Sequence, residues 1–203
     1  NNSLSNVETM YLESINKYVV ISQDSNKAYC NLYTIISDQL SLNNSPVELS
    51  SSAIGKTTMC FDDINNKLHV FFHDSANNNQ ETYITGSIVN STITFNTKQI
   101  YNDSNLQNEI SCEFDPNTQK VIVFYINSSN VLCSKVGTYS AELEFGSEQS
   151  SSVANVTTIS SYYDPTNKSI ALLYIDPNNG NFVTLNMCTI NGSNVNYGTA
   201  HVI

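Results

Sequence analysis

The chain repeats one sequence unit four times, and this repetition limits what it can fold into more than any other feature. The best copy opens with Phe114-Asp115-Pro116, passes through a short polar turn to Lys120, and continues into an apolar run. The other copies follow the same order with different residues. The acidic anchors of the four copies are Glu13, Asp62, Asp115 and Asp164, spaced by 49, 53 and 49 residues. A period of about 50 residues is typical of propellers and other repeat architectures.

A second set of anchors runs in phase with the acids. Its members are Leu42, Phe95, Phe145 and Tyr197, spaced by 53, 50 and 52 residues. Because two independent anchors share one period, chance similarity is a poor explanation. We therefore interpret residues 1–203 as a single repeat domain whose units span approximately 8–55, 56–107, 108–156 and 157–203.

Each unit predicts four short strands. The first ends at the acidic anchor, where the Asp and a following Pro or Asn favour a tight turn. The second strand is continuously apolar, which fits a strand covered on both faces. The third is more polar and carries Gly86 in the second unit and Gly137 in the third, and the fourth ends at the second anchor. Helical periodicity is absent from the sequence.

Four strands per repeat in series predict an all-β fold of β-propeller type, built from four four-stranded blades. One such blade cannot bury both faces of its sheet, whereas stacked neighbours can. The four units would close a four-bladed ring or form part of a larger ring or array. An all-β sandwich or a solenoid is the alternative architecture.

The composition excludes some partners. Asn, Ser and Thr fill 75 of the 203 positions, there are 8 Lys and no Arg, and the net charge is -10. Nucleic acid is an unexpected partner, because phosphate contacts depend on Arg and Lys. Insertion into a membrane is also unexpected, because no stretch approaches the roughly 20 apolar residues of a spanning helix.

Neither the cysteines nor the glycosylation sequons identify a compartment by themselves. The five cysteines are widely spaced and lie in apolar runs, which favours buried thiols, although a Cys30–Cys188 disulfide is an alternative. Asn-x-Ser/Thr sequons are about as frequent as this composition gives by chance. Those considered as glycosylation sites begin at Asn90, Asn102, Asn127, Asn155, Asn167 and Asn191.

The repeat resembles a family of extracellular and phage-virion propeller repeats with the pattern aromatic-Asp-Pro, Lys, Tyr, Gly-Thr and Phe-Gly. The third unit carries the pattern best, in Phe114-Asp115-Pro116, Lys120, Tyr125, Gly137-Thr138 and Phe145-Gly146. The fourth keeps Tyr163-Asp164-Pro165, Lys168, Tyr174 and Tyr197-Gly198, and the first keeps little beyond Glu13 and Lys17. The resemblance implies a surface, virion or filament component that binds or builds rather than reacts.

No catalytic, cofactor or metal site is predicted. The repeated acids could form a metal ring or the carboxylate pair of a glycoside hydrolase, but each precedes a turn that an acid would cap. His69 and His73 lie four apart on a predicted strand, about 13 Å from each other, which is too far to share a metal. The sequence contains neither a phosphate-binding loop nor a dinucleotide fingerprint.

These observations lead to one main functional hypothesis and two alternatives. The main hypothesis is a non-catalytic extracellular propeller that builds or binds within a virion, fibre, filament or cell surface, with other protein subunits as partners. The first alternative is a carbohydrate-binding, lectin-like module, in which some of the 12 tyrosines would line a sugar-binding face. The second alternative is a propeller glycoside hydrolase.

Overall fold

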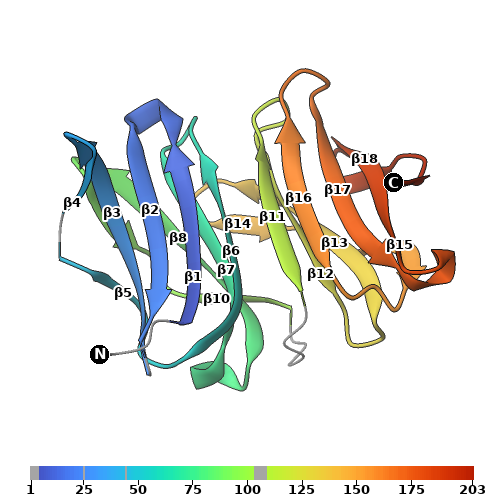
Figure 1. Cartoon of the computed structure of the whole chain (residues 1–203), viewed down its shortest axis with the longest axis horizontal. Helices are drawn as coiled ribbons and strands as arrows, with labels where there is room; N and C mark the ends of the chain where they lie inside the picture. The colour runs from blue at the N-terminus through green and yellow to red at the C-terminus, as the bar shows by residue number, and fades with distance from the viewer. Residues whose placement is uncertain (1–4, 25, 44, 103–108) are drawn as a thin grey trace. The chain divides into compact units, whose positions relative to one another are not determined.

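The computed structural model describes residues 5–24, 26–43, 45–102 and 109–203. Within these residues the chain forms four antiparallel sheets and no α-helix, which confirms the predicted all-β fold (Figure 1). The sheets divide between two compact units, Asn1–Gln107 and Asn108–Ile203. Each unit contains two sheets and is described by itself.

The first unit contains sheets 1 and 2. Sheet 1 consists of β1 (Ser5–Leu12), β2 (Lys17–Gln23), β3 (Ala28–Ile36), β4 (Gln39–Leu42) and β5 (Val47–Ser50). Sheet 2 consists of β6 (Ile54–Asp62), β7 (Lys67–Asp74), β8 (Gln80–Val89), β9 (Thr92–Phe95) and β10 (Gln99–Asn102).

The second unit contains sheets 3 and 4. Sheet 3 consists of β11 (Ile110–Asp115), β12 (Lys120–Ile126), β13 (Val131–Tyr139), β14 (Leu143–Phe145) and β15 (Gln149–Ala154). Sheet 4 consists of β16 (Ile159–Asp164), β17 (Ser169–Asp176), β18 (Phe182–Asn191), β19 (Asn194–Tyr197) and β20 (His201–Val202). The described part also holds three short 3-10 turns, η1 (Glu13–Ile15), η2 (Ser75–Asn77) and η3 (Pro177–Asn179).

All four sheets share one topology, which corrects the predicted strand count in one respect. Three consecutive strands form a meander, and the expected fourth strand pairs with the third. A short fifth strand, which lies in the segment expected to be a linker, also pairs with the third. In sheet 2, for example, β9 pairs with one half of β8 and β10 with the other. Asn96, the residue after β9, still bonds to the third strand, because its backbone amide donates to the carbonyl of Thr85 at 2.9 Å, and β10 begins three residues later.

Strand register also corrects the alignment of two repeats. Asp62 pairs with Lys67 and Asp115 with Lys120, and the matching pair in sheet 4 is Asp164 with Ser169. The turn of the fourth unit is therefore as long as the others, and Lys168 occupies its left-handed position. In sheet 1 Leu12 pairs with Lys17, so Leu12 stands at the place of the repeated acids and Glu13 begins η1.

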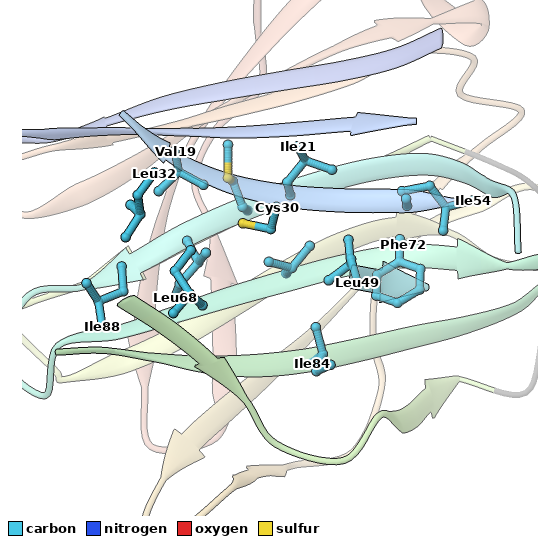
Figure 2. Close-up of a cluster of buried hydrophobic side chains, with 14 of the residues drawn as sticks. Val19, Ile21, Cys30, Leu32, Leu49, Ile54, Leu68, Phe72, Ile84 and Ile88 are labelled. Carbon is cyan, nitrogen blue, oxygen red and sulfur yellow. The ribbon is translucent and has the colours of Figure 1, made fainter. Parts of the chain in front are cut away.

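The core of the first unit lies between its two sheets (Figure 2). Alternate residues of β2 and β3 face sheet 2, and alternate residues of β7 and β8 face sheet 1, as the two-residue period of a strand requires. The fully buried members of this cluster include Val19, Ile21, Leu32, Leu68 and Phe72. Each such side chain contributes about 1.5–3 kcal/mol when it leaves water.

The second unit repeats this packing. Ile122 and Phe124 of sheet 3 pack with Ile170 and Leu172 of sheet 4 in one buried cluster. The innermost strands, β11 and β16, lie side by side and are joined by serines, because Ser111 accepts a hydrogen bond from the backbone amide of Ser161 at 2.9 Å. Blade-on-blade packing in both units explains why the second strand of each repeat is so apolar.

Candidate functional site: a tyrosine face on sheet 1

The repeated acids are structural in their observed contacts. Asp62 is fully buried, and its Oδ1 accepts hydrogen bonds from the backbone amides of Ile64 (3.1 Å) and Asn65 (2.9 Å). Asp115 and Asp164 accept equivalent bonds from the amides two residues later, at 2.9 and 2.8 Å. These are the bonds of side-chain-capped turns, and they leave the three carboxylates at separate turns.

The second-anchor residues pack against the third strand of their own sheets. Phe95 pairs with Gly86, and Phe145 pairs with Gly137. A Cβ atom on Gly86 would lie 2.8 Å from the ring of Phe95, so the ring occupies the space that a side chain at position 86 would need. Tyr197 pairs instead with Cys188 and donates a hydrogen bond to the Ser134 hydroxyl at 2.8 Å.

The remaining candidates form no metal site. His69 and His73 are buried on β7, and Nδ1 of His69 lies 3.0 Å from the Thr85 hydroxyl. Nε2 of His73 lies 3.7 Å from a carboxylate oxygen of Glu81. No group of three or more potential ligands could hold a metal ion in the described ranges.

All five cysteines are buried free thiols, so the alternative of a Cys30–Cys188 disulfide is wrong. Burial raises the pKa of both Cys30 and Cys188 to about 12, which keeps them protonated and unreactive. None of the helical segments in the described part is long and apolar enough to cross a membrane.

The sequons considered for glycosylation lie mostly in turns. Asn90, Asn155, Asn167 and Asn191 are exposed. The side chain of Asn127 accepts hydrogen bonds from the amides of Ser129 and Val131, and Asn102 ends β10. Glycosylation of any of them stays a prediction.

Sequence reasoning missed a surface on sheet 1, which we call the tyrosine face. It is the side of sheet 1 opposite the core of the first unit. Its residues, assigned from strand register and alternation, are Thr9, Tyr11, Tyr18, Val20, Ser22, Tyr29, Asn31, Tyr33, Leu42 and Glu48. Four of the 12 tyrosines therefore share one side of one sheet.

A single cross-strand ladder organises this face. Tyr11 pairs with Tyr18, Tyr18 with Tyr33, and Tyr33 with Leu42, so four side chains line up across β1 to β4. Three strand spacings extend over about 14 Å. Tyr11 is 47% exposed and Leu42 is 44% exposed, while Tyr18 and Tyr33 are half-buried. The ladder is thus an apolar and aromatic strip that is open to solvent.

Comparison of the same ladder among the repeats shows why sheet 1 differs. The equivalent ladders are Phe61–Leu68–Gly86–Phe95, Phe114–Val121–Gly137–Phe145 and Tyr163–Ile170–Cys188–Tyr197. In these three ladders the two central positions are aliphatic or small. In sheet 1 both central positions are tyrosines. The sequence already shows that the first copy departs from the repeat. Only the strand register, however, shows that Tyr18 and Tyr33 occupy positions that are aliphatic or small in the other copies.

Outside the tyrosine face, the carboxyl group of Glu113 lies in a largely buried environment. Burial raises the pKa of Glu113 on β11 to about 7, against the opposing effect of hydrogen bonds from the Ser161 hydroxyl and the Tyr163 amide. The distance from Ser161 Oγ to Glu113 Oε1 is 3.4 Å. The hydrogen-bonding partners of this carboxyl, Ser161 and the Tyr163 amide, are neutral, whereas glycoside hydrolysis requires a second carboxylate opposite the first.

No protein-family model and no curated protein matches this sequence. Solved structures do resemble it: SapL1 lectin in complex with α-methyl fucoside has a TM-score of 0.57 at 11% identity, covering 97% of this chain and 63% of that chain. A variant of Aleuria aurantia lectin in complex with α-methyl-L-fucoside has a TM-score of 0.59 at 12% identity, covering 91% of this chain and 56% of that chain. The same lectin variant in complex with Fucα1-6GlcNAc has a TM-score of 0.59 at 12% identity, covering 91% of this chain and 57% of that chain. The chain thus spans less than two thirds of the length of these lectins, and the likeness establishes a β-propeller type of fold.

Proposed function

We propose that this chain is a non-catalytic, extracellular carbohydrate-binding protein whose binding surface is the tyrosine face. The observation that carries the proposal is the open ladder Tyr11–Tyr18–Tyr33–Leu42. Aromatic rings pack on the apolar side of a sugar ring, and tyrosine hydroxyls supply hydrogen bonds to its polar edge. The lectin structures with a similar fold add support, because they were solved with fucosides bound.

The geometry favours binding over reaction. The carboxylates of the repeated acids Asp62, Asp115 and Asp164 accept hydrogen bonds from turn amides. Among the described residues of the tyrosine face, the one acid is Glu48, which pairs with Lys27 at 2.7 Å. A hydrolase would need two carboxylates on either side of the bond it cleaves.

Calorimetric titration and a glycan array test the proposal together. The array should contain α-methyl fucoside and Fucα1-6GlcNAc beside other neutral and acidic glycans. We expect binding by the native chain, and a loss of affinity of about tenfold in Tyr18→Ala, because one stacked ring contributes about 1.5 kcal/mol. Tyr162→Ala is the matched control, since Tyr162 is 69% exposed on sheet 4.

Two results would contradict the proposal. The first is an array on which the native chain binds no glycan at all. The second is a glycan that binds equally well to the native chain and to Tyr18→Ala, with both proteins folded, because that glycan would then occupy another surface.

A second function, assembly with other protein subunits, is favoured by a different observation. The outward side of sheet 4 is apolar: Tyr162 and Val183 are exposed there, and Leu173, Leu185 and Met187 are half-buried. The equivalent side of sheet 1 is covered by sheet 2, and that of sheet 3 by sheet 4. The one acid on this side among the described residues, Asp164, lies at its turn end, so on a chain of net charge -10 the apolar centre can meet another subunit without burying a charge.

Light scattering tests this second function. We expect the native chain to self-associate with increasing concentration and Val183→Lys to remain monomeric, because a buried lysine in the contact would lack a partner. Thr9→Lys on sheet 1 is the control and should associate like the native chain. A native chain that stays monomeric at all concentrations would reject self-assembly through sheet 4, and with it the analogy to virion or filament repeats.

A further inference from the structure

A buried acceptor lies within the tyrosine face. Asn31 on β3 is 7% exposed, and its side-chain oxygen Oδ1 accepts no hydrogen bond from the described residues. Alternation along β3 places Asn31 on the same side as Tyr29 and Tyr33, and register places it opposite Val20. An amide oxygen that is withdrawn from water without a donor destabilises the folded chain.

The hydrogen bonding of Asn31 differs from that of the asparagine at the same position in sheet 4. The equivalent residues, paired with the middle of the second strand, are Ile84 in sheet 2, Lys135 in sheet 3 and Asn186 in sheet 4. Asn186 is satisfied within its own sheet, because its Oδ1 accepts a hydrogen bond from the Tyr174 hydroxyl at 2.7 Å. In sheet 1 the residue in the place of Tyr174 is Ser22, which is too short to reach in the same way. The acceptor of Asn31 is therefore left for a donor from outside the sheet.

The charges around the face select the kind of donor. Lys27 lies at the edge, where it pairs with Glu48 at 2.7 Å, and the other face residues are neutral. The chain as a whole carries a net charge of -10. A carboxylated or sulfated sugar would meet an overall negative field with no unpaired cation on the face, whereas a hydroxyl needs only an acceptor.

We infer that the tyrosine face binds a neutral glycan, with an apolar ring side on the Tyr18–Tyr33 ladder and one sugar hydroxyl donating to Oδ1 of Asn31. This inference rests on the proposed function and adds the residue that determines specificity. The ladder, about 14 Å long, suits a short oligosaccharide better than a single sugar ring. The hydroxyl of the glycan would satisfy the amide oxygen that the fold leaves without a donor.

Asn31→Val separates this role from a structural one. Valine removes the unsatisfied oxygen and favours a strand, so the variant should unfold at a higher temperature than the native chain. The same variant should bind a neutral glycan from the array about tenfold more weakly, because the hydrogen bond to the sugar is lost. Asn31→Thr, which retains an acceptor oxygen, is the second variant and should bind more tightly than Asn31→Val.

The outcomes distinguish this inference from the proposed function. If the native chain binds a neutral glycan and Asn31→Val and Asn31→Thr bind it equally well, the role of Asn31 is rejected while carbohydrate binding stands. If a sulfated or carboxylated derivative of that glycan binds as tightly as the neutral form in low salt, the selection for neutral sugars is rejected. Binding of no glycan by the native chain rejects both. Higher thermal stability with weaker binding in Asn31→Val supports the inference.

Discussion

The rings of Tyr11 and Tyr18 lie on neighbouring strands with their centroids 4.9 Å apart and their planes inclined by 39°. The hydroxyl of Tyr11 donates a hydrogen bond to Oδ1 of Asn16 at 3.0 Å, which fixes the ring at the end of the ladder. Asn16 holds this position in the left-handed backbone conformation that asparagine tolerates. Local turn chemistry thus orients one end of the proposed sugar-binding strip.

We expect Tyr11→Phe and Tyr11→Ala to separate the ring from its hydroxyl. Tyr11→Phe keeps the aromatic surface and loses an exposed hydrogen bond, so glycan affinity should change by less than about threefold. Tyr11→Ala removes the surface and should weaken binding by about tenfold. Calorimetric titration with one glycan measures both values. Equal losses in the two variants would show that the hydroxyl, and not the ring, makes the contact.

Gly86→Ala should destabilise the first unit by about 1–3 kcal/mol, because an added methyl group has no room beside the Phe95 ring. Denaturant unfolding measures this loss. Gly137→Ala is the matched control, since its Cβ would lie 3.0 Å from the Phe145 ring and the loss should be smaller. The double variant Gly86→Ala/Phe95→Leu should recover part of the stability. An unchanged unfolding midpoint in Gly86→Ala would contradict the packing described.

Asp62→Ala should cost about 2 kcal/mol and Asp164→Ala about 1 kcal/mol or less. Both acids bond to turn amides, but the side chain of Asp62 is fully buried, so its removal costs hydrogen bonds that are shielded from water and also leaves a void. Asp164 is exposed enough for water to replace it. Thermal unfolding of the two variants compares the costs directly. A larger loss in Asp164→Ala than in Asp62→Ala would show that burial does not set the cost.

Glu113 should make the stability of the second unit depend on pH. Burial raises the pKa of its carboxyl from 4.5 to about 7 in the folded chain. The folded state then binds the proton more tightly than the unfolded state, so the stabilisation is present at low pH and is lost as the pH rises from about 4.5 to about 7. The loss is on the order of 3 kcal/mol at most, from 1.36 kcal/mol per unit.

Unfolding measured between pH 4.5 and 8 tests this dependence against Glu113→Gln. The glutamine stays neutral at every pH. The unfolding free energy of the native chain should therefore decrease relative to that of the variant through this window, and the difference between the two should become constant above pH 7. Parallel profiles for the two proteins would show that Glu113 ionises at its usual pKa.

The repeat made the architecture predictable from the sequence. Two anchors with one period, and a continuously apolar second strand such as Val121–Tyr125, were enough to predict serial antiparallel sheets packed face to face. The fifth strand of each sheet was not predicted, because a four-residue segment such as Gln99–Asn102 is too short to show a strand pattern of its own, and its pairing with β8 forms only when the sheet exists. The alignment of Glu13 and Lys168 was off by one residue for the same reason, since strand register decides which residues correspond.

The asparagine excess illustrates a property that the sequence determined. Asparagine adopts the left-handed conformation more readily than other non-glycine residues, and a chain of short strands needs many such turns. Of the fourteen non-glycine residues with positive φ in the described part, eight are asparagine. The chain has only seven glycines, so asparagine takes over their role at these turns.

The binding face, in contrast, was decided by the tertiary structure. Tyr11, Tyr18 and Tyr33 are separated by 7 and 15 residues, and no sequence period joins them. They form a ladder because β1, β2 and β3 pair in a particular register. Sheet 2 packs on the other side of sheet 1, and the ladder lies on the side that stays open to solvent. Repetition and composition thus fixed which strands and turns the chain can form. Register and sheet packing decided which side chains meet, because these depend on contacts between residues far apart in the sequence.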